Sequence, residues 1–452
     1  MRFDRGFGVG FSVLSLVSGV GACLGSAPDA SVDGGTSSSL DTGVPGDETP
    51  VTPGDETTVP PGGDAQPDGT LGPSDAGDGG IEAAPPPAMC VDGGDAVCGA
   101  NGKCVSGTCG CVSGFTSCGT CTDTTMDAAN CGRCGHSCGG GACSNGQCQP
   151  FMVGTFDSMS SGELAVDENN VYAVITGGVP ELDGSRTSGV EACSVNGCSA
   201  PTVLARDIPQ YGYDIFANST GVFWTSITAG GAAGFKVPEA TGTAGVYASY
   251  STEQPIWIVA DSQNAYWTLS PNGGSNFAGI VSCPVSGCVG SPTVIFQMGK
   301  PFYLALGGST LFYPDSTGLE AVSTSAADAN QVASLFAPAP SGHTYSYPAA
   351  DSTDVVWADD TSSATGISAC PITGCPGGGP IVITSQNAGG PAIDASGVYW
   401  TTGTSILKCA ASGCASNPTT VVSGITASPL VTVVNSTAIF WANGDVVWKI
   451  AK

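Results

Sequence analysis

Cysteine is the side chain in this sequence with the greatest capacity for chemistry, and its spacing allows two kinds. Twelve of the 21 cysteines lie between positions 90 and 148. Two pairs there, Cys118-x2-Cys121 and Cys131-x2-Cys134, have the spacing of zinc-ligating knuckles. The same cysteines could instead pair as disulfides, as in exported chains with small modules. Because the knuckles are close together for zinc and the chain begins with an export signal, we expect disulfides, with no metal and no cofactor.

Carboxylates and amides recur at one position of a long repeat in residues 150–452. Five residues before each aromatic anchor of that repeat, six of seven positions are Asp or Asn. Short Asx side chains close turns by accepting hydrogen bonds from the backbone two residues on. A ring of these side chains could alternatively bind a cation at one mouth of a channel. We expect the turn-closing role at these positions: Asp167, Asn218, Asp261, Gly307, Asp351, Asp394 and Asn435.

The other residue types that support catalysis are scarce. There are two histidines, His136 and His343, too few for a His-ligated metal cluster or a Ser-His-Asp set in the repeats. No Gly-rich phosphate loop follows a strand and opens a helix. We therefore name no catalytic residue and lean against an enzyme. A carboxylate pair of the glycosidase type remains open.

The net charge of the chain limits the classes of molecule that it is expected to bind. The chain has 452 residues, with 38 acidic and 11 basic side chains and a net charge of −27. Such a balance repels nucleic acids and anionic membrane surfaces. The many glycines and prolines indicate turns and little helix. We expect no nucleic-acid partner, membrane attachment through a lipid only, and a monomer.

The amino terminus has the features of an export signal. Arg2 and Arg5 precede a weakly apolar stretch, 7–20, that is too short to span a bilayer. The sequence Val-Gly-Ala-Cys that ends at Cys23 resembles a bacterial lipobox, which implies a signal peptide over 1–22 and diacylation of Cys23. Removing Cys23 from the count leaves an even 20 cysteines that can all pair. The alternative is ordinary cleavage near Ala27, which would give a secreted protein instead of an outer-membrane lipoprotein.

Residues 23–89 follow as a predicted stalk. From 24 to 89 there is no Lys, Arg or aromatic residue, and Gly, Pro, Ser, Thr and Asp dominate. Such a composition cannot bury enough apolar surface to offset its ordering entropy. We expect a disordered linker.

The first six clustered cysteines resemble an epidermal-growth-factor-like module over 90–118. The carrying features are Cys98-x5-Cys104-x4-Cys109-x-Cys111 and the later Gly114-Phe115 and Cys118. The resemblance implies bridges Cys90–Cys104, Cys98–Cys109 and Cys111–Cys118.

The second six resemble the cysteine-rich stigma-specific protein family over 119–149. The resemblance rests on the string from Asp127 to Cys138 and on Asn-Gly-Gln-Cys at 145–148. It leaves the connectivity open among Cys121, Cys131, Cys134, Cys138, Cys143 and Cys148.

The repeats predict an all-β propeller over 150–452. Aromatic anchors recur at intervals of 41 to 51 residues between runs typical of short strands. One unit is expected to have strands 256–260, 265–269, 279–283 and 292–297. Seven units are counted, the last of which ends after its third strand, 446–451. We expect 150–156 to supply its missing outer strand and close the ring.

The anchors resemble the Tyr-Trp-Thr-Asp repeats of lipoprotein-receptor propellers, which usually have six blades. The tetrad is not intact here, since Leu269 and Thr402 stand where Asp is expected. A six-bladed ring stays open if the first repeat, with Ala173 at a Trp position, is not a blade.

Four units also contain Cys-x4-Cys with Gly before the second cysteine. Paired residues of a short hairpin lie at disulfide distance, and Gly permits the turn. We expect four structural bridges that link Cys193 to Cys198, Cys283 to Cys288, Cys370 to Cys375, and Cys409 to Cys414.

Together these features predict a surface lipoprotein whose propeller recognises a protein or a glycan without catalysis. One alternative is a carbohydrate lyase or hydrolase with acidic residues at the channel mouth. The other is a structural component of the cell envelope.

Overall fold

The computed structural model describes residues 89–452 apart from 92–93, 181–185, 209–210, 229–230, 238–244, 251–252, 272–277, 289–290, 298–300, 326–331, 386–387, 415–416 and 426–431. All of the described elements belong to one compact unit, 83–452. The predicted signal peptide, Cys23 and almost all of the predicted stalk lie outside the described residues. Within the described ranges, no helix combines the length and the apolarity that a membrane span requires.

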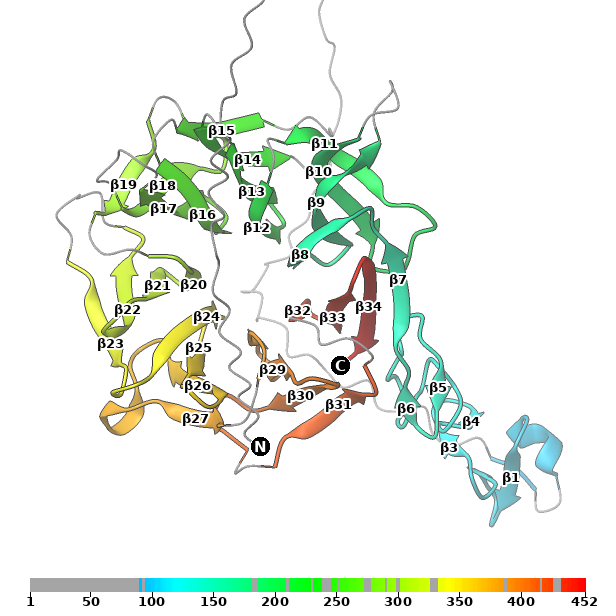
Figure 1. Cartoon of the computed structure of the whole chain (residues 1–452). Helices are drawn as coiled ribbons and strands as arrows, with labels where there is room; N and C mark the ends of the chain where they lie inside the picture. The colour runs from blue at the N-terminus through cyan, green and yellow to red at the C-terminus, as the bar shows by residue number, and fades with distance from the viewer. Residues whose placement is uncertain are drawn as a thin grey trace, which may run out of the picture. The chain divides into compact units, whose positions relative to one another are not determined.

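The repeats form four-stranded antiparallel sheets arranged as the blades of a β-propeller (Figure 1). Six sheets each consist of four strands consecutive in the sequence, and the ring is completed by a composite seventh sheet. In every sheet the first strand of the repeat lies innermost, and these inner strands contact one another around the ring, β32 against β8 included. The strands of the six consecutive sheets are β8 (Met159–Val166), β9 (Asn170–Pro180), β10 (Arg186–Ser194) and β11 (Thr202–Ile208); β12 (Tyr211–Asn218), β13 (Gly221–Thr228), β14 (Gly231–Val237) and β15 (Gly245–Tyr250); β16 (Glu253–Ala260), β17 (Asn264–Pro271), β18 (Gly279–Pro284) and β19 (Thr293–Phe296); β20 (Ala305–Gly307), β21 (Thr310–Pro314), β22 (Gly318–Ser323) and β23 (Ser334–Pro338); β24 (Thr344–Ala350), β25 (Asp354–Asp360), β26 (Thr365–Pro371) and β27 (Ile381–Thr384); β28 (Ala392–Asp394), β29 (Gly397–Thr401), β30 (Ser405–Cys409) and β31 (Thr419–Ser423).

The composite sheet joins the two ends of the propeller. Its first three strands are β32 (Thr432–Val434), β33 (Ala438–Asn443) and β34 (Val446–Ala451), and its outer strand is β7 (Phe151–Thr155). β34 pairs antiparallel with β7, with Val446 opposite Thr155 and Lys449 opposite Phe151. The prediction that residues near 151–153 would close the ring is confirmed. The four strands predicted for 256–297 are confirmed as well, as β16 to β19.

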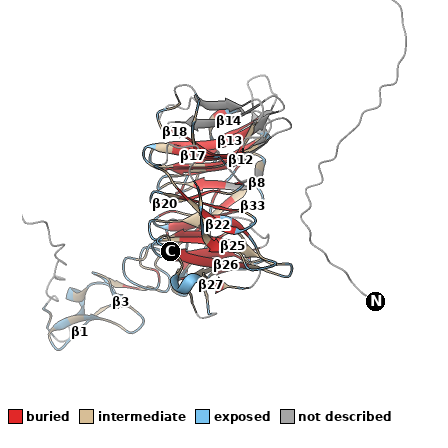
Figure 2. Ribbon diagram, turned by 90° about the vertical axis from the view of Figure 1, so that its left-hand side faces the viewer, coloured by how far each residue is buried: buried red, intermediate tan, exposed pale blue. Residues whose placement is uncertain are grey.

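The aromatic anchors explain why the blades pack against one another. Each anchor is a pair of adjacent residues on the second strand of a sheet, so its two side chains point to opposite faces. The first residue of a pair lies in one core cluster with the second residue of the next pair. Phe223 thus clusters with Trp267, Phe312 with Trp357, and Val356 with Trp400. The buried residues lie within the ring of sheets in Figure 2, and each boundary between neighbouring sheets has its own apolar core.

The boundary between the last and first sheets has a different composition, because Ala173 occupies the position where other repeats have a large ring. Ala173 lies in a cluster with Phe440 of β33. Phe156, which directly follows β7, is 1% exposed and fills the same cluster together with Val153. The closing strand therefore supplies the aromatic volume that the first repeat lacks.

The cysteine region preceding the propeller is joined by six bridges, two of which match the expected pairs Cys90–Cys104 and Cys98–Cys109. The expected Cys111–Cys118 bridge is wrong: Cys111 pairs with Cys121, and Cys118 with Cys134. A hairpin of β3 (Thr116–Ser117) and β4 (Cys121–Thr122) explains this, because Cys118 lies in its turn and Cys121 on its returning strand. These two bridges cross the boundary predicted at 118/119. The remaining pairs are Cys131–Cys143 and Cys138–Cys148.

All four cysteines of the two candidate zinc knuckles are thus in disulfides. None of these four cysteines therefore has a free thiolate with which to bind zinc. The same holds for the two groups of three cysteines with sulfur atoms close enough to share an ion, since their members are also bridged.

The four Cys-x4-Cys bridges of the propeller are present as predicted. The first cysteine of each lies on the third strand of its sheet, opposite a residue next to the anchor pair, as Cys370 lies opposite Val355. Val322 and Ile450 occupy the same register position opposite Leu311 and Ile439. An apolar residue therefore replaces the bridge in these sheets.

Candidate functional site

The repeated Asp and Asn side chains lie at one end of the channel and close the turns after the inner strands. The Asp261 Oδ1 atom accepts hydrogen bonds from the main-chain nitrogens of Gln263 and Asn264, both at 2.7 Å. The side chains of Asp167, Asn218, Asp351, Asp394 and Asn435 accept from the nitrogen two residues on in the same way.

Two of the amides also join neighbouring sheets. Asn218 Nδ2 donates to Ala260 O at 3.0 Å, and Asn435 Nδ2 donates to Asp167 O at 3.0 Å. The turn-closing prediction is confirmed, and these side chains have a structural role that accounts for their recurrence.

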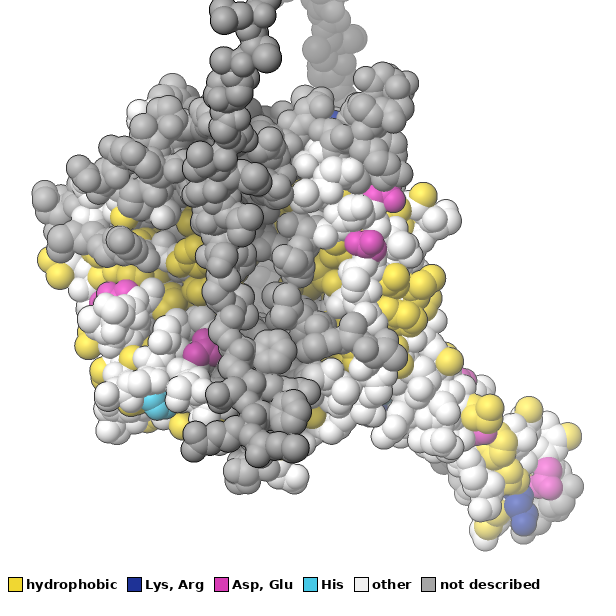
Figure 3. Space-filling view, in the orientation of Figure 1, with side chains coloured by type: hydrophobic (Ala, Val, Ile, Leu, Met, Phe, Trp, Pro, Cys, Tyr) yellow, Lys and Arg dark blue, Asp and Glu magenta, His cyan; other side chains and the backbone are white. Residues whose placement is uncertain are grey.

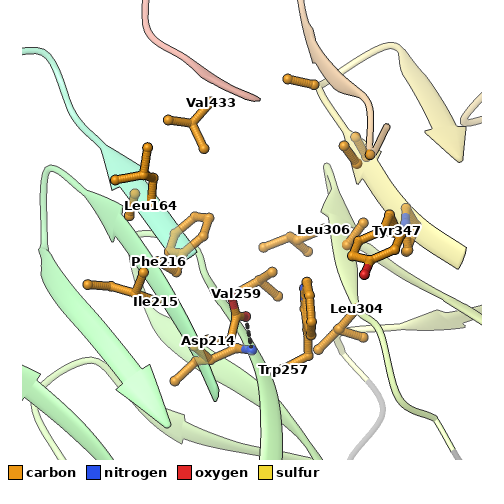
Figure 4. Close-up of a pocket in the computed structure, with 18 of the residues that line it drawn as sticks. Leu164, Asp214, Ile215, Phe216, Trp257, Val259, Leu304, Leu306, Tyr347 and Val433 are labelled. Carbon is orange, nitrogen blue, oxygen red and sulfur yellow. Dashed lines mark hydrogen bonds between the residues drawn. The ribbon is translucent and has the colours of Figure 1, made fainter. Parts of the chain in front are cut away.

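The channel itself contains a cavity of about 360 Å³, lined by the innermost segment of every sheet. Its wall is mostly aliphatic, with Leu164, Val259, Leu306 and Val433 among the lining side chains (Figure 4). A volume of this size lies within the range of small-ligand pockets. Among the lining residues that the structure describes, Asp214 supplies the one carboxyl group.

Toward the other end of the channel, four neighbouring blades contribute residues from one repeat position, four residues before the turn-closing position. These residues are Asp214 on β12, Trp257 on β16, Tyr303 just before β20, and Tyr347 on β24. The ring centroids of Trp257 and Tyr303 are 4.8 Å apart, and those of Tyr303 and Tyr347 are 4.5 Å apart. Phe302 extends the group, 5.0 Å from Tyr303. We call Trp257, Phe302, Tyr303 and Tyr347 the aromatic cluster.

Two rings of the aromatic cluster reach solvent: Phe302 is 43% exposed and Tyr347 is 39% exposed. The backbone holds Tyr347 in an unusual conformation, with φ of 46° in a non-glycine residue, which is uncommon and often found at functional sites. Gly390 of the neighbouring blade lies close, since a Cβ there would be 3.4 Å from the Tyr347 side chain. The exposed ring is therefore positioned by its own backbone and by the blade beside it.

Two acidic side chains of β25, Asp359 and Asp360, lie at this end of the propeller. Asp360 accepts hydrogen bonds from Ser346 Oγ and Thr365 Oγ1, both at 2.6 Å. Asp359 Oδ1 lies 2.6 Å from His343 Nδ1. Burial, a hydrogen bond with Tyr347 and the charge of Asp360 raise the pKa of Tyr303, so its hydroxyl remains protonated at neutral pH and can donate hydrogen bonds.

Asp214 is the acidic residue at this end of the channel whose pKa is shifted most. It is 8% exposed, and its Oδ2 atom accepts a hydrogen bond of 2.8 Å from Ile258 N, where β16 departs from regular pairing with β17. Desolvation by burial raises the pKa of Asp214 to about 8, outweighing the hydrogen bonds from Ile258 and Ile215 that favour the charged form. A neutral carboxyl group therefore faces the channel over most of the physiological pH range.

Of the residues singled out from the sequence, the structure brings the repeated Asx side chains together at one end of the ring. His343 lies at the aromatic end beside Asp359, and His136 lies in the cysteine region. The aromatic cluster and Asp214 were missed. The sequence signal for them is their shared repeat position, four residues before the turn-closing residue.

No family model matches the chain, and no curated protein matches it. Solved structures similar to it include an oligogalacturonate lyase from Vibrio parahaemolyticus, with 9% identity and a TM-score of 0.48 over 66% of this chain and 90% of that one. The Neurospora crassa Pan2 WD40 domain has 9% identity and a TM-score of 0.47 over 66% and 95%. A chain of a nidogen/laminin complex has 16% identity and a TM-score of 0.36 over 51% and 84%. At such identities the likenesses concern the propeller fold alone and indicate neither a ligand nor an activity.

Proposed function

We propose that this protein is an exported, surface-tethered binding protein whose propeller binds a glycan at the aromatic end of the channel, without catalysis. The observation that carries the proposal is the aromatic cluster, with exposed rings at Phe302 and Tyr347, of which Tyr347 lines the channel cavity. Binding sites for small ligands combine aromatic walls with a few placed polar groups. Here the apolar faces of a sugar would pack on the two rings, and Tyr303 and Asp360 would hydrogen-bond its hydroxyl groups.

The exported location is supported by chemistry. All twenty cysteines after Cys23 pair in ten disulfides, which form and persist in oxidising compartments. We propose that Cys23 bears the lipid anchor, that 24–89 tethers the folded part, and that the protein is monomeric. The EGF-like and stigma-specific-protein-like modules remain proposals for 90–118 and 119–149. The bridges across residue 118 suggest that they would fold as one piece.

A glycan array probed with the exported chain tests the binding proposal. We expect binding that Phe302→Ala and Tyr347→Ala each weaken at least tenfold, about 1.4 kcal/mol. Leu335→Ala is the matched control, because Leu335 is 50% exposed on the outer strand β23, away from the channel. Retained binding in both ring variants would place the glycan elsewhere. Capture of an envelope protein with no glycan binding would replace the glycan by a protein partner.

One observation favours the alternative of a carbohydrate-active enzyme: Asp214 is a carboxyl group with a raised pKa that faces a cavity, as catalytic acids often do. Incubation with a panel of polysaccharides, followed by assays for new reducing ends and unsaturated products, tests it. Turnover that Asp214→Asn abolishes would establish the enzyme and overturn the non-catalytic proposal.

A further inference from the structure

The Asp214 carboxyl group lies in a setting that the glycan proposal does not use. Its neighbours in the channel are the rings of Phe216 and Trp257 and the aliphatic side chains of Val259 and Leu306 (Figure 4). Among the described residues that line the cavity there is no Lys, Arg or His, and Tyr347 is the other titratable side chain. On the face drawn in Figure 3, the described part of the ring shows mainly hydrophobic and neutral side chains, with scattered acidic ones and a histidine.

We infer that the channel is a binding site for a small apolar molecule with one ammonium group, whose cation lies against Asp214 and whose apolar part fills the cavity. A buried carboxylate is costly unless a cation pairs with it, and the described wall of the cavity provides none. Aromatic faces add attraction for cations, and the rings of Phe216 and Trp257 line the same cavity as the carboxyl group. The main-chain donors Ile258 and Ile215 are already placed to stabilise its ionised form.

The size of the cavity limits the ligand. A cavity of about 360 Å³ is near the lower end of the range for small-molecule pockets. It suits a compact amine rather than a peptide or an oligosaccharide. The inference does not depend on glycan binding, because Phe302, which the glycan proposal requires, is not among the residues that line the cavity.

Binding of a cation must also move a proton. In the free protein the Asp214 carboxyl is neutral near pH 6.5 because its pKa is raised, and it must ionise to pair with an ammonium group. The carboxyl proton leaves to solvent as the ammonium ion enters. Binding should therefore release up to one proton below about pH 8, and less as the pH rises through that value.

The experiment uses two probes of equal size, benzylammonium and benzyl alcohol, titrated into the full exported chain by ligand-observed NMR and calorimetry at pH 6.5. We expect benzylammonium to bind at least tenfold more tightly than the alcohol, and its binding enthalpy to vary with buffer as proton release requires. Asp214→Asn should remove this preference, and it retains an oxygen that accepts from Ile258 N. The control Asp359→Asn removes a carboxylate outside the cavity and should leave the preference unchanged.

Equal binding of the two probes, binding of neither, or an unchanged preference in Asp214→Asn would overturn the inference. If Asp214→Asn does not fold, the wild-type protein still decides, because a cation preference without proton release would also contradict it. These outcomes are separate from those of the glycan array, since Phe302→Ala should leave benzylammonium binding intact.

Discussion

The Nε2 atom of His136 lies 2.9 Å from the main-chain oxygen of Lys452, which joins the cysteine region to the segment that follows the last strand of the propeller. Its Nδ1 atom lies 2.6 Å from the main-chain oxygen of Cys131. Nearby, the ring of Phe151 packs against Gly140, where an added Cβ would be 3.5 Å away, and Lys449 Nζ lies 5.3 Å from the centroid of that ring. The cysteine region therefore packs on the sheet that closes the ring.

His136→Ala should weaken this contact between the cysteine region and the propeller. It removes the ring whose N–H donates to the main-chain oxygen of Cys131 or of Lys452, a hydrogen bond with a net value of about 1 kcal/mol, and it leaves Lys452 held by its own N–H bond to Thr437 O. We expect faster amide exchange over 446–452, measured by hydrogen–deuterium exchange. His343→Ala is the control, because His343 lies on the aromatic rim. Unchanged exchange over 446–452 would show that the His136 side chain does not stabilise the packing of the cysteine region on the propeller.

The closing strand can be tested by two substitutions at adjacent positions of β7. Val153 is 1% exposed and Met152 is 51% exposed, because successive side chains of a strand point to opposite faces. Val153→Asp should lower the free energy of unfolding by several kcal/mol, as expected for an unpaired buried carboxylate. Met152→Asp should change it by less than about 0.5 kcal/mol. Similar losses in denaturant unfolding of the two variants would mean that β7 does not close the ring as described.

Asp214 should make stability depend on pH. Its pKa is about 8 in the folded protein against 3.8 for an ordinary Asp, so folding takes up a proton between these values. Its contribution is complete below about pH 4 and is lost as pH rises toward about 8, at up to about 1.4 kcal/mol per pH unit. Asp214→Asn should therefore show a shallower fall in stability over this window, measured by urea unfolding at several pH values. Parallel curves for the two proteins would contradict the raised pKa.

The hairpin bridges can be removed in two ways. In the chain-entropy model, so small a loop contributes about 2 kcal/mol, and Cys370 is fully buried. Cys370→Val with Cys375→Ala should lose less than this, because Val322 and Ile450 show that an apolar residue fits the equivalent position. Cys370→Ser with Cys375→Ala should lose about 1 to 3 kcal/mol more, since a hydroxyl group is buried there. Thermal unfolding that ranks the two double variants equally would refute this account.

Local signals were enough to predict the propeller and its closing strand. Each anchor pair predicts how its blade packs against both neighbouring blades, because adjacent residues of a strand point to opposite faces of the sheet. The Asx turns and the Cys-x4-Cys bridges could also be predicted, since each depends on residues a few positions apart. The Cys111–Cys121 bridge could not be predicted in this way. The short hairpin of β3 and β4 determines that Cys121, and not Cys118, pairs with Cys111.

The candidate site was harder to predict for a different reason. Trp257, Tyr303 and Tyr347 are close only because successive blades bring one repeat position together, and their segments share no residue type that marks a motif. The raised pKa of Asp214 arises from burial, which a sequence does not display. The turn-closing residues, in contrast, were visible because they repeat in six of seven units.

The sheet that combines β34 with β7 also has a mechanical consequence. Any tension on the chain before Pro150 reaches the ring through the outer strand of a blade, where the pairing of Lys449 with Phe151 and of Val446 with Thr155 would resist it. The same tension would act on Val153 and Phe156, whose departure would open the core between the last and first blades. Under tension, the ring would therefore begin to unfold at the sheet that β34 forms with β7.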